Sequence, residues 1–213
     1  MRNPVPRRAV LALPGLALAG LALPGGLAGP ALAIPPGGYR WRILRDGSPI
    51  GTHRVAVGVD GASRTAATDV EIVVRLAGFT VYRYTHSFTE TWDGPRLVSL
   101  RSRSDRNGTP GAVTVRREGD ALVVEGGPDG TVRLPGNAAP LSWWDPAVLT
   151  RPLFEVTTGR PEPTLAREGA ANGASRWRLS ASPNSEATYD AAGNWTGYAT
   201  RGTDGSAVTY AAL

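Results

Sequence analysis

The stretch from residue 79 to residue 105 constrains the fold most, because it has the pattern of a long β-hairpin. Alternate residues of its first arm are aromatic or ionisable, and most of those between them are Thr or Ser. A period of two with aromatic and β-branched residues is typical of a half-buried strand. Asp93-Gly94-Pro95 should form the turn, because Asp and Gly tolerate the backbone angles of a tight reversal. One face of the first arm is therefore expected to carry Tyr82, Tyr84, His86, Phe88, Glu90 and Trp92.

The pairing of the two arms follows from keeping apolar residues together on that face. A shift of one residue would bring Leu97 and Ser99 onto it and lower its apolar content. We therefore predict a register that starts with Trp92 opposite Arg96. The predicted pairs are Trp92–Arg96, Glu90–Val98, Phe88–Leu100 and His86–Ser102.

Residues 1–33 have the pattern of an export signal. A basic start that includes Arg7-Arg8 precedes an apolar stretch, residues 9 to about 23, and Ala31-Leu32-Ala33 is a small-x-small cleavage signal. The apolar stretch is too short and too rich in Gly and Pro for a membrane anchor. We expect cleavage after Ala33. The pair Arg7-Arg8 fits a twin-arginine signal and a general secretory signal equally well, and either would export the remaining chain.

The remaining 180 residues are enough for one domain with a sizeable core. The chain has no cysteine, so it can form no disulfide, no thiolate metal site and no cysteine-linked lipid anchor. We therefore expect a single domain from residue 34 to residue 213. It should be a soluble, monomeric periplasmic protein with no membrane span in its exported part.

The basic charge does not indicate a nucleic-acid partner. All 23 basic residues are arginine, which together with abundant Ala, Gly and Pro is typical of a GC-rich genome. Without the three arginines of the signal, 20 basic and 18 acidic residues remain, a net charge of +2. No dense basic run is interleaved with aromatic residues, so we expect no nucleic-acid binding.

The rest of the chain alternates between short strand patterns and turn signals, from residues 39–45 to residues 207–212. Most of the connections are too short for crossover helices, so the sheet should be an antiparallel meander. Twist accumulates across such a meander until the sheet curls. We predict an all-β fold in which a curled antiparallel meander of about eleven strands forms a barrel or half-barrel.

One segment, residues 135–150, breaks the period of two. Asp145-Pro146 has the pattern of an N-cap followed by Pro in the first helical position, which predicts a short helical turn. A long irregular segment inside a β domain is usually a lid, a plug or a crossing loop. Trp143 and Trp144 would then either contact a ligand beneath a lid or anchor a crossing loop. Residues 151–159 are expected to be extended.

Five stretches, spread over nearly the whole exported part, carry a resemblance to known proteins. They are YRWRILRDGSPIGTHRVAV, VYRYTHSFTETWDGPRLVSLRSRSD, EGDALVVEGG, SWWDPAVL and ATYDAAGNWTGYATRGTDGSAVTY. Together they resemble a family of exported bacterial proteins of unknown function. More distantly, the final hairpin and the incomplete-barrel layout resemble the carriers that move lipoproteins across the periplasm. That second resemblance implies a curved sheet that holds a hydrophobic ligand under a lid, although those carriers use several helices as a plug and this chain predicts one at most.

His53, His86 and Glu90 are the residue types of a catalytic zinc site. However, His86 and Glu90 lie four residues apart on one strand, roughly 13 Å at a rise of about 3.3 Å per residue, which is too far to share an ion. We therefore predict no metal, and expect each histidine to bond a Ser, Thr or Tyr neighbour. The sequence has no nucleophile elbow, metalloprotease helix, phosphate loop or dinucleotide fingerprint, so we expect neither an enzyme nor a cofactor.

Glu90 lies between Phe88 and Trp92, where an unpaired carboxylate would be costly to bury. An arginine such as Arg96 should pair with it, or else the face lines a wet cavity. No strand clearly offers the second inward carboxylate that glycoside hydrolysis needs.

These patterns favour a soluble periplasmic binding or carrier module for a hydrophobic, lipid-like ligand, with an apolar cavity of roughly several hundred Å³. The alternative is a structural or interaction protein of the cell envelope whose core is filled by its own side chains. An uncharacterised hydrolase ranks third. The candidate ligand contacts are Trp41, His53, Tyr82, Tyr84, His86, Phe88, Glu90, Trp92, Trp143 and Trp144.

Overall fold

The computed structural model describes residues 34–163, 165–169, 171–179 and 185–213. These residues belong to one compact unit, which contains the hydrophobic core. The predicted export signal and its cleavage after Ala33 lie outside the described residues.

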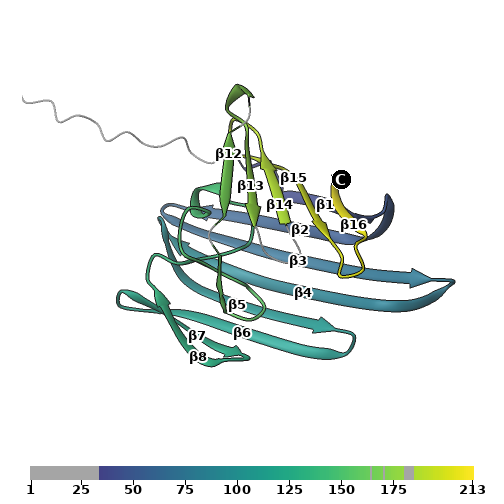
Figure 1. Cartoon of the computed structure of the whole chain (residues 1–213). Coiled ribbons are helices and arrows are strands. Elements are labelled where there is room, and N and C mark those ends of the chain that lie inside the picture. Colours follow the sequence, from purple (N-terminus) through teal and green to yellow (C-terminus); the bar gives the residue numbers. More distant parts are fainter. Residues whose placement is uncertain (1–33, 164, 170, 180–184) are drawn as a thin grey trace, which may run out of the picture. The chain divides into compact units, whose positions relative to one another are not determined.

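Thirteen strands of the described residues form one antiparallel sheet in the order β12-β13-β14-β15-β16-β1-β2-β3-β4-β5-β6-β7-β8. The chain runs outwards from β1 to β8 and returns from β12 to β16, so the last strand pairs with the first in the middle of the sheet (Figure 1). The strands are β1 (Tyr39–Arg45), β2 (Ser48–Asp60), β3 (Ser63–Leu76), β4 (Phe79–Asp93), β5 (Arg96–Arg106), β6 (Thr109–Glu118), β7 (Ala121–Gly127), β8 (Gly130–Pro135), β12 (Ala166–Gly169), β13 (Ser175–Leu179), β14 (Ser185–Tyr189), β15 (Trp195–Arg201) and β16 (Ala207–Ala212).

The sheet is open, so the predicted barrel or half-barrel is wrong and the prediction of about eleven strands was too low. Closure requires the two edge strands to hydrogen-bond to each other. Here the edges are β8 and β12, and neither has a second partner strand in the described residues. The residues between β8 and β12 do not continue the meander and form a separate small sheet. The all-β class and the antiparallel meander are confirmed.

Residues 136–163, the crossing segment, link the two halves of the large sheet. They contain a small sheet of β9 (Ala139–Pro140), β10 (Leu153–Phe154) and β11 (Pro161–Glu162). The predicted helical turn is the 3-10 helix η1 (Pro146–Val148), and the Asp145 carboxylate caps it by accepting a hydrogen bond from the Ala147 amide. Side chains of the crossing segment share one hydrophobic core with one face of the large sheet. We call that face the inner face, and the opposite one the outer face.

The alternation predicted for the first arm of the hairpin is confirmed in β4. His86, Phe88, Glu90 and Trp92 are buried on the inner face, whereas Thr85, Ser87 and Thr89 are exposed on the outer face. Tyr82 and Tyr84 follow the same alternation but are only half-buried.

The predicted register between the two arms is wrong. Trp92 pairs with Leu97 rather than with Arg96, because the register shifts next to Trp92 and leaves Val98 as an extra residue on β5. Such a bulge reverses the facing of the residues beyond it. Leu97 and Leu100 consequently both reach the buried face although they are three residues apart. The observed pairs are Trp92–Leu97, Glu90–Leu100, Phe88–Ser102 and His86–Ser104.

Three hairpins turn through two residues that both have positive φ, which is the pattern of a type I′ turn. Two of them use the favoured residues, Asp46-Gly47 and Asn107-Gly108. The third, between β3 and β4, places Ala77 at φ 49° before Gly78. Alanine lacks the polar side chain that lets Asn and Asp adopt this conformation more readily.

Replacing Ala77 by asparagine is therefore expected to raise the free energy of unfolding by about 1 kcal/mol, because asparagine tolerates the left-handed conformation better. Urea unfolding of the two proteins, followed by tryptophan fluorescence, measures the difference. A lower unfolding free energy for Ala77→Asn would show that the turn does not hold residue 77 at positive φ.

Candidate functional site

The inner face contains a buried carboxylate that joins the sheet to the crossing segment. Glu90 on β4 has no exposed surface. Its carboxylate accepts hydrogen bonds from the indole Nε1 of Trp92 at 2.8 Å and of Trp144 at 3.1 Å, and it also bonds the Ser142 side chain. Arg96, the arginine expected to pair with it, bonds Asp93 instead. Neutral donors thus replace the predicted ion pair.

Burial raises the pKa of Glu90 from 4.5 to about 7, and the hydrogen bonds from Ser142, Trp92 and Trp144 offset part of that rise. The carboxyl group is consequently partly protonated near neutral pH. With no exposed surface, it has no contact with solvent or with a dissolved substrate.

Arg64 on β3 contacts both tryptophans of this network and links them to Asp145. Its guanidinium pairs with the Asp145 carboxylate at 3.0 Å and lies over the rings of Trp92 and Trp144, 5.7 and 5.6 Å from their centroids. Cation–π contacts at this distance are favourable, more so when they are shielded from water. The crossing segment is therefore fixed to β3 and β4 by polar contacts as well as by packing.

The two adjacent tryptophans anchor the crossing segment. Glu90, Trp92 and Trp144 each have a relative exposure of 0%, and Trp143 is also buried. The Trp143 carbonyl accepts a hydrogen bond from the Tyr189 hydroxyl at 2.6 Å. Side chains around an empty ligand cavity would keep accessible surface, so this part of the inner face is filled by the protein's own side chains.

Trp41 and His53 lie in a second aromatic cluster, where β1 and β2 meet the C-terminal strands. The His53 ring contacts Trp195 and Tyr210, and its Nδ1 lies 3.2 Å from the Tyr210 hydroxyl. Burial, and then the nearby His86, lower the pKa of His53 to about 3, so the ring is neutral. The buried Trp41 Nε1, His53 Nε2 and Thr68 Oγ1 make no hydrogen bond within the described residues.

His86 is separated from His53 by one strand, since both residues pair with Val70 on β3. Two strand spacings are about 10 Å, too far for one metal ion. His86 bonds the Ser102 hydroxyl at 2.9 Å, and burial lowers its pKa to about 4. Among the described residues, no three His, Cys, Asp or Glu side chains are placed to hold a metal.

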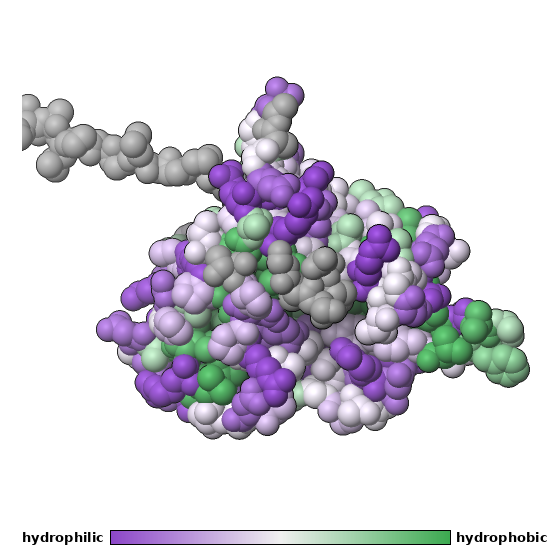
Figure 2. Space-filling model, viewed as in Figure 1, coloured by the Kyte–Doolittle hydropathy of each residue, from purple (hydrophilic) through white to green (hydrophobic). Residues whose placement is uncertain are grey.

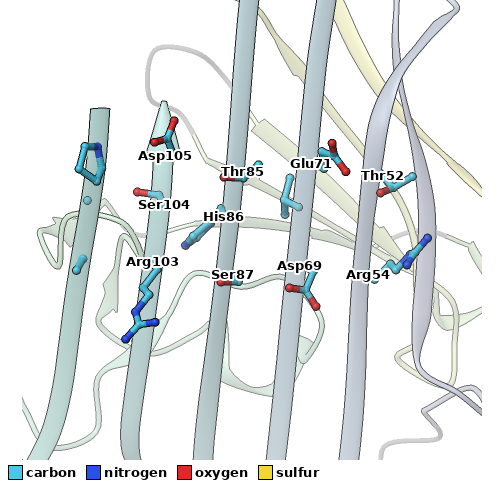
Figure 3. Close-up of a pocket in the computed structure, with 14 residues that line it drawn as sticks. Thr52, Arg54, Asp69, Glu71, Thr85, His86, Ser87, Arg103, Ser104 and Asp105 are labelled. Atoms are coloured by element: carbon cyan, nitrogen blue, oxygen red, sulfur yellow. The ribbon is translucent and has the colours of Figure 1, made fainter. Parts of the chain in front are cut away.

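The outer face carries a groove that the sequence did not indicate, with a volume of about 870 Å³ (Figure 3). Two rows of outward-facing side chains run across strands β2 to β6 and border the groove on its two sides. Between these rows lies the backbone of a third row of residues, which includes Val70 and His86. One row is Arg54, Asp69, Ser87, Arg103 and Ala112, and the other is Thr52, Glu71, Thr85, Asp105 and Pro110.

Most of the charged groups of the groove form no ion pair within the described residues, and Asp105 accepts a hydrogen bond from the Gly108 amide. Arg54 and Asp69 are direct cross-strand neighbours, yet no ion pair joins Arg54, Asp69, Glu71 or Arg103 to another group in the described part of the chain. Ser87 lies between Asp69 and Arg103 with no histidine beside it on that face, because His86 points to the inner face. The groove can therefore present guanidinium, carboxylate and hydroxyl groups to a polar ligand, but it holds no Ser-His pair for nucleophilic catalysis.

These features define an all-β protein with one open antiparallel sheet, a filled inner face and a polar outer groove. The chain belongs to the family described as Domain of unknown function (DUF6134), whose profile matches residues 41–212. Comparison with curated proteins and with solved structures gave no match, and nothing found links the chain to the lipoprotein carriers. In the described residues, no helix has the length and apolar character needed to cross a membrane.

Proposed function

We propose that the protein is a non-catalytic interaction module of the cell envelope, whose core is filled by its own side chains and whose ligand binds the outer groove. The observation that carries this proposal is the complete burial of Glu90, Trp92 and Trp144 against one another. A carrier for a hydrophobic ligand would need open apolar volume at this place. The packing therefore favours the interaction module over the carrier.

The groove supports a ligand that is polar and elongated. Five neighbouring strands at a spacing of about 4.8 Å give it a length of roughly 19 Å. Arg54 and Arg103 supply positive charge, and Asp69, Glu71 and Asp105 supply negative charge. A ligand with groups of both charges, such as an extended peptide segment of another envelope protein, would complement this lining.

The ionisable residues of the inner face support a non-catalytic role. Burial keeps His53 and His86 neutral, and Glu90 has no contact with solvent. A general acid or base must come within hydrogen-bond reach of the proton that it transfers. None of these three side chains lies on the groove side of the sheet.

Photo-crosslinking tests the groove directly. We expect p-benzoylphenylalanine at the position of Ser87, in the middle of the groove, to form a covalent product with a second protein when cells that make the chain are irradiated. Thr114 provides a matched control, because it is also exposed on the outer face but lies outside the groove. Equal products from both positions, or no product from position 87, would contradict the proposal.

A further inference from the structure

The β3–β4 hairpin ends in an exposed apolar tip. Leu76, Phe79 and Val81 are 68%, 76% and 54% exposed. Leu76 and Phe79 pair only with each other, because β2 pairs with β3 only as far as Ile72 and β5 pairs with β4 only as far as Tyr84. In Figure 2 an apolar projection lies at the right, where Figure 1 draws the end of this hairpin. Large apolar side chains gathered on one projecting turn are a sign of an interaction site.

The hairpin has one apolar face and one basic face. Strand alternation and the cross-strand pairs Val74–Tyr82 and Leu76–Phe79 place these four side chains on the continuation of the inner face. The opposite face carries Arg75 and Arg83, with their cross-strand partners Thr80 and Val73. A bulge at Val81 preserves this separation, because without it Phe79 would share a face with Arg83.

The turn residue adds to the apolar character of the tip. The other two type I′ hairpins of the sheet turn through Asp46-Gly47 and Asn107-Gly108, which suit the left-handed conformation. Here Ala77 takes that position at φ 49°. A backbone conformation that the residue does not favour, kept at an exposed tip, points to a role outside folding.

The charge next to the tip is mainly positive, with Asp46 of the β1–β2 turn as the acidic residue that shares a surface pocket with Arg75. Arg75, Arg83 and Arg106 take part in no ion pair among the described residues, and Arg106 lies over the Tyr84 ring at 5.6 Å. The acidic groups of β3, β4 and β5 that lie nearest to the tip, Glu71 and Asp105, belong to the row of Thr85. That row is five residues from Leu76, roughly 16 Å along the strand.

We propose that the β3–β4 hairpin docks the protein on a lipid bilayer that carries anionic headgroups. Leu76, Phe79 and Val81 enter the boundary between headgroups and acyl chains, where apolar side chains are favoured. Arg75 and Arg83 remain at the headgroups, where a guanidinium forms paired hydrogen bonds with phosphate oxygens. The negative surface potential of such a bilayer adds to the attraction of each arginine.

Co-sedimentation with vesicles tests this proposal. The chain without residues 1–33, which retains the whole described core, is mixed with vesicles of phosphatidylglycerol and phosphatidylcholine or of phosphatidylcholine alone. We expect about tenfold tighter binding to the anionic vesicles, falling as salt is added. The double variant Leu76→Ser, Phe79→Ser should weaken binding at least tenfold, and Arg75→Gln, Arg83→Gln should remove the preference for anionic lipid.

Val59→Ser provides the matched control, because Val59 is 65% exposed on β2, near the turn at the other end of β3. This variant should bind vesicles as the unaltered protein does. Circular dichroism of each variant verifies that the fold is retained, as expected for exposed positions. No binding to either vesicle, binding that ignores lipid charge, or equal binding by the Leu76→Ser, Phe79→Ser variant would overturn the proposal.

Discussion

Replacing Glu90 by glutamine is expected to shift the free energy of unfolding progressively in favour of the variant, relative to the unaltered chain, as the pH rises from 4.5 to 7. The gain should reach about 3 kcal/mol, since the pKa of Glu90 rises from 4.5 to about 7 on folding and one pKa unit corresponds to about 1.4 kcal/mol. Glutamine does not ionise, and its single amide oxygen can accept from only one of the two indole groups, which bond different carboxylate oxygens of Glu90. The loss of the second acceptor lowers the stability of the variant by the same amount at every pH, so it leaves the pH dependence unchanged.

The sign follows from proton binding. Because burial raises the pKa of Glu90, the folded state holds a proton that the unfolded state releases between pH 4.5 and pH 7. The contribution of Glu90 to stability is therefore fully present below pH 4.5 and is lost as the pH rises to 7. His53 and His86 act in the opposite direction, because their pKa values are lowered by burial, so their contribution is lost as the pH falls below 6.5.

Urea unfolding of both proteins at several pH values measures the effect, and the difference between them isolates Glu90 from the histidines. Asp60→Asn removes one exposed carboxylate that forms no ion pair among the described residues, and it controls for the change in net charge. A difference between Glu90→Gln and the unaltered protein that stays constant from pH 4.5 to pH 8 would mean that Glu90 is not buried as described.

Replacing Trp144 by alanine is expected to lower the free energy of unfolding by about 4 kcal/mol, because it leaves a large cavity between the crossing segment and the sheet. It also removes one of the indole donors to Glu90 and a ring beneath Arg64. This is the expected cost of deleting a core residue. Deleting a side chain that only closed a ligand cavity would lower the free energy of unfolding much less.

Trp144→Phe separates packing from hydrogen bonding. Phenylalanine keeps most of the ring volume but has no Nε1 donor. The free energy of unfolding of Trp144→Phe should therefore fall by about 2 kcal/mol, which places it between the unaltered protein and Trp144→Ala. Chemical denaturation with near-ultraviolet circular dichroism follows both variants. A loss below about 1 kcal/mol for Trp144→Ala would place Trp144 outside the core.

Local patterns in the sequence predicted local structure well. The expected strands 39–45 and 207–212 coincide with β1 and β16, because their alternation and flanking turn residues are strong. Asp145-Pro146 predicted the capped turn of η1, because an N-cap needs only neighbouring residues. The aromatic face of β4 was also predicted correctly.

Features that depend on distant residues were not predictable in the same way. Alternation within a strand does not reveal its neighbours, so the pairing of β1 with β16, which leaves β8 and β12 as open edges, was missed. The bulge at Val98 changed the register, because one extra residue has no clear sign in the sequence. Trp144 bonds Glu90 from 54 residues away, whereas the sequence suggested Arg96.

The outer groove was missed for a different reason. Its side chains are the polar residues that alternate with the apolar ones along each strand, and such residues predict a face exposed to solvent. Only the cross-strand register places Arg54, Asp69, Ser87 and Arg103 in one row. The same register shows that Leu76 and Phe79 extend the apolar face beyond the crossing segment.

Native mass spectrometry tests the filled core most directly. The full chain is purified without organic solvent from the cells that make it and is transferred gently into the gas phase. Because Glu90, Trp92 and Trp144 are packed against one another, we predict that no lipid-sized mass accompanies the polypeptide. A lipid-sized mass that disappears after chloroform–methanol extraction would contradict the account and restore the carrier hypothesis.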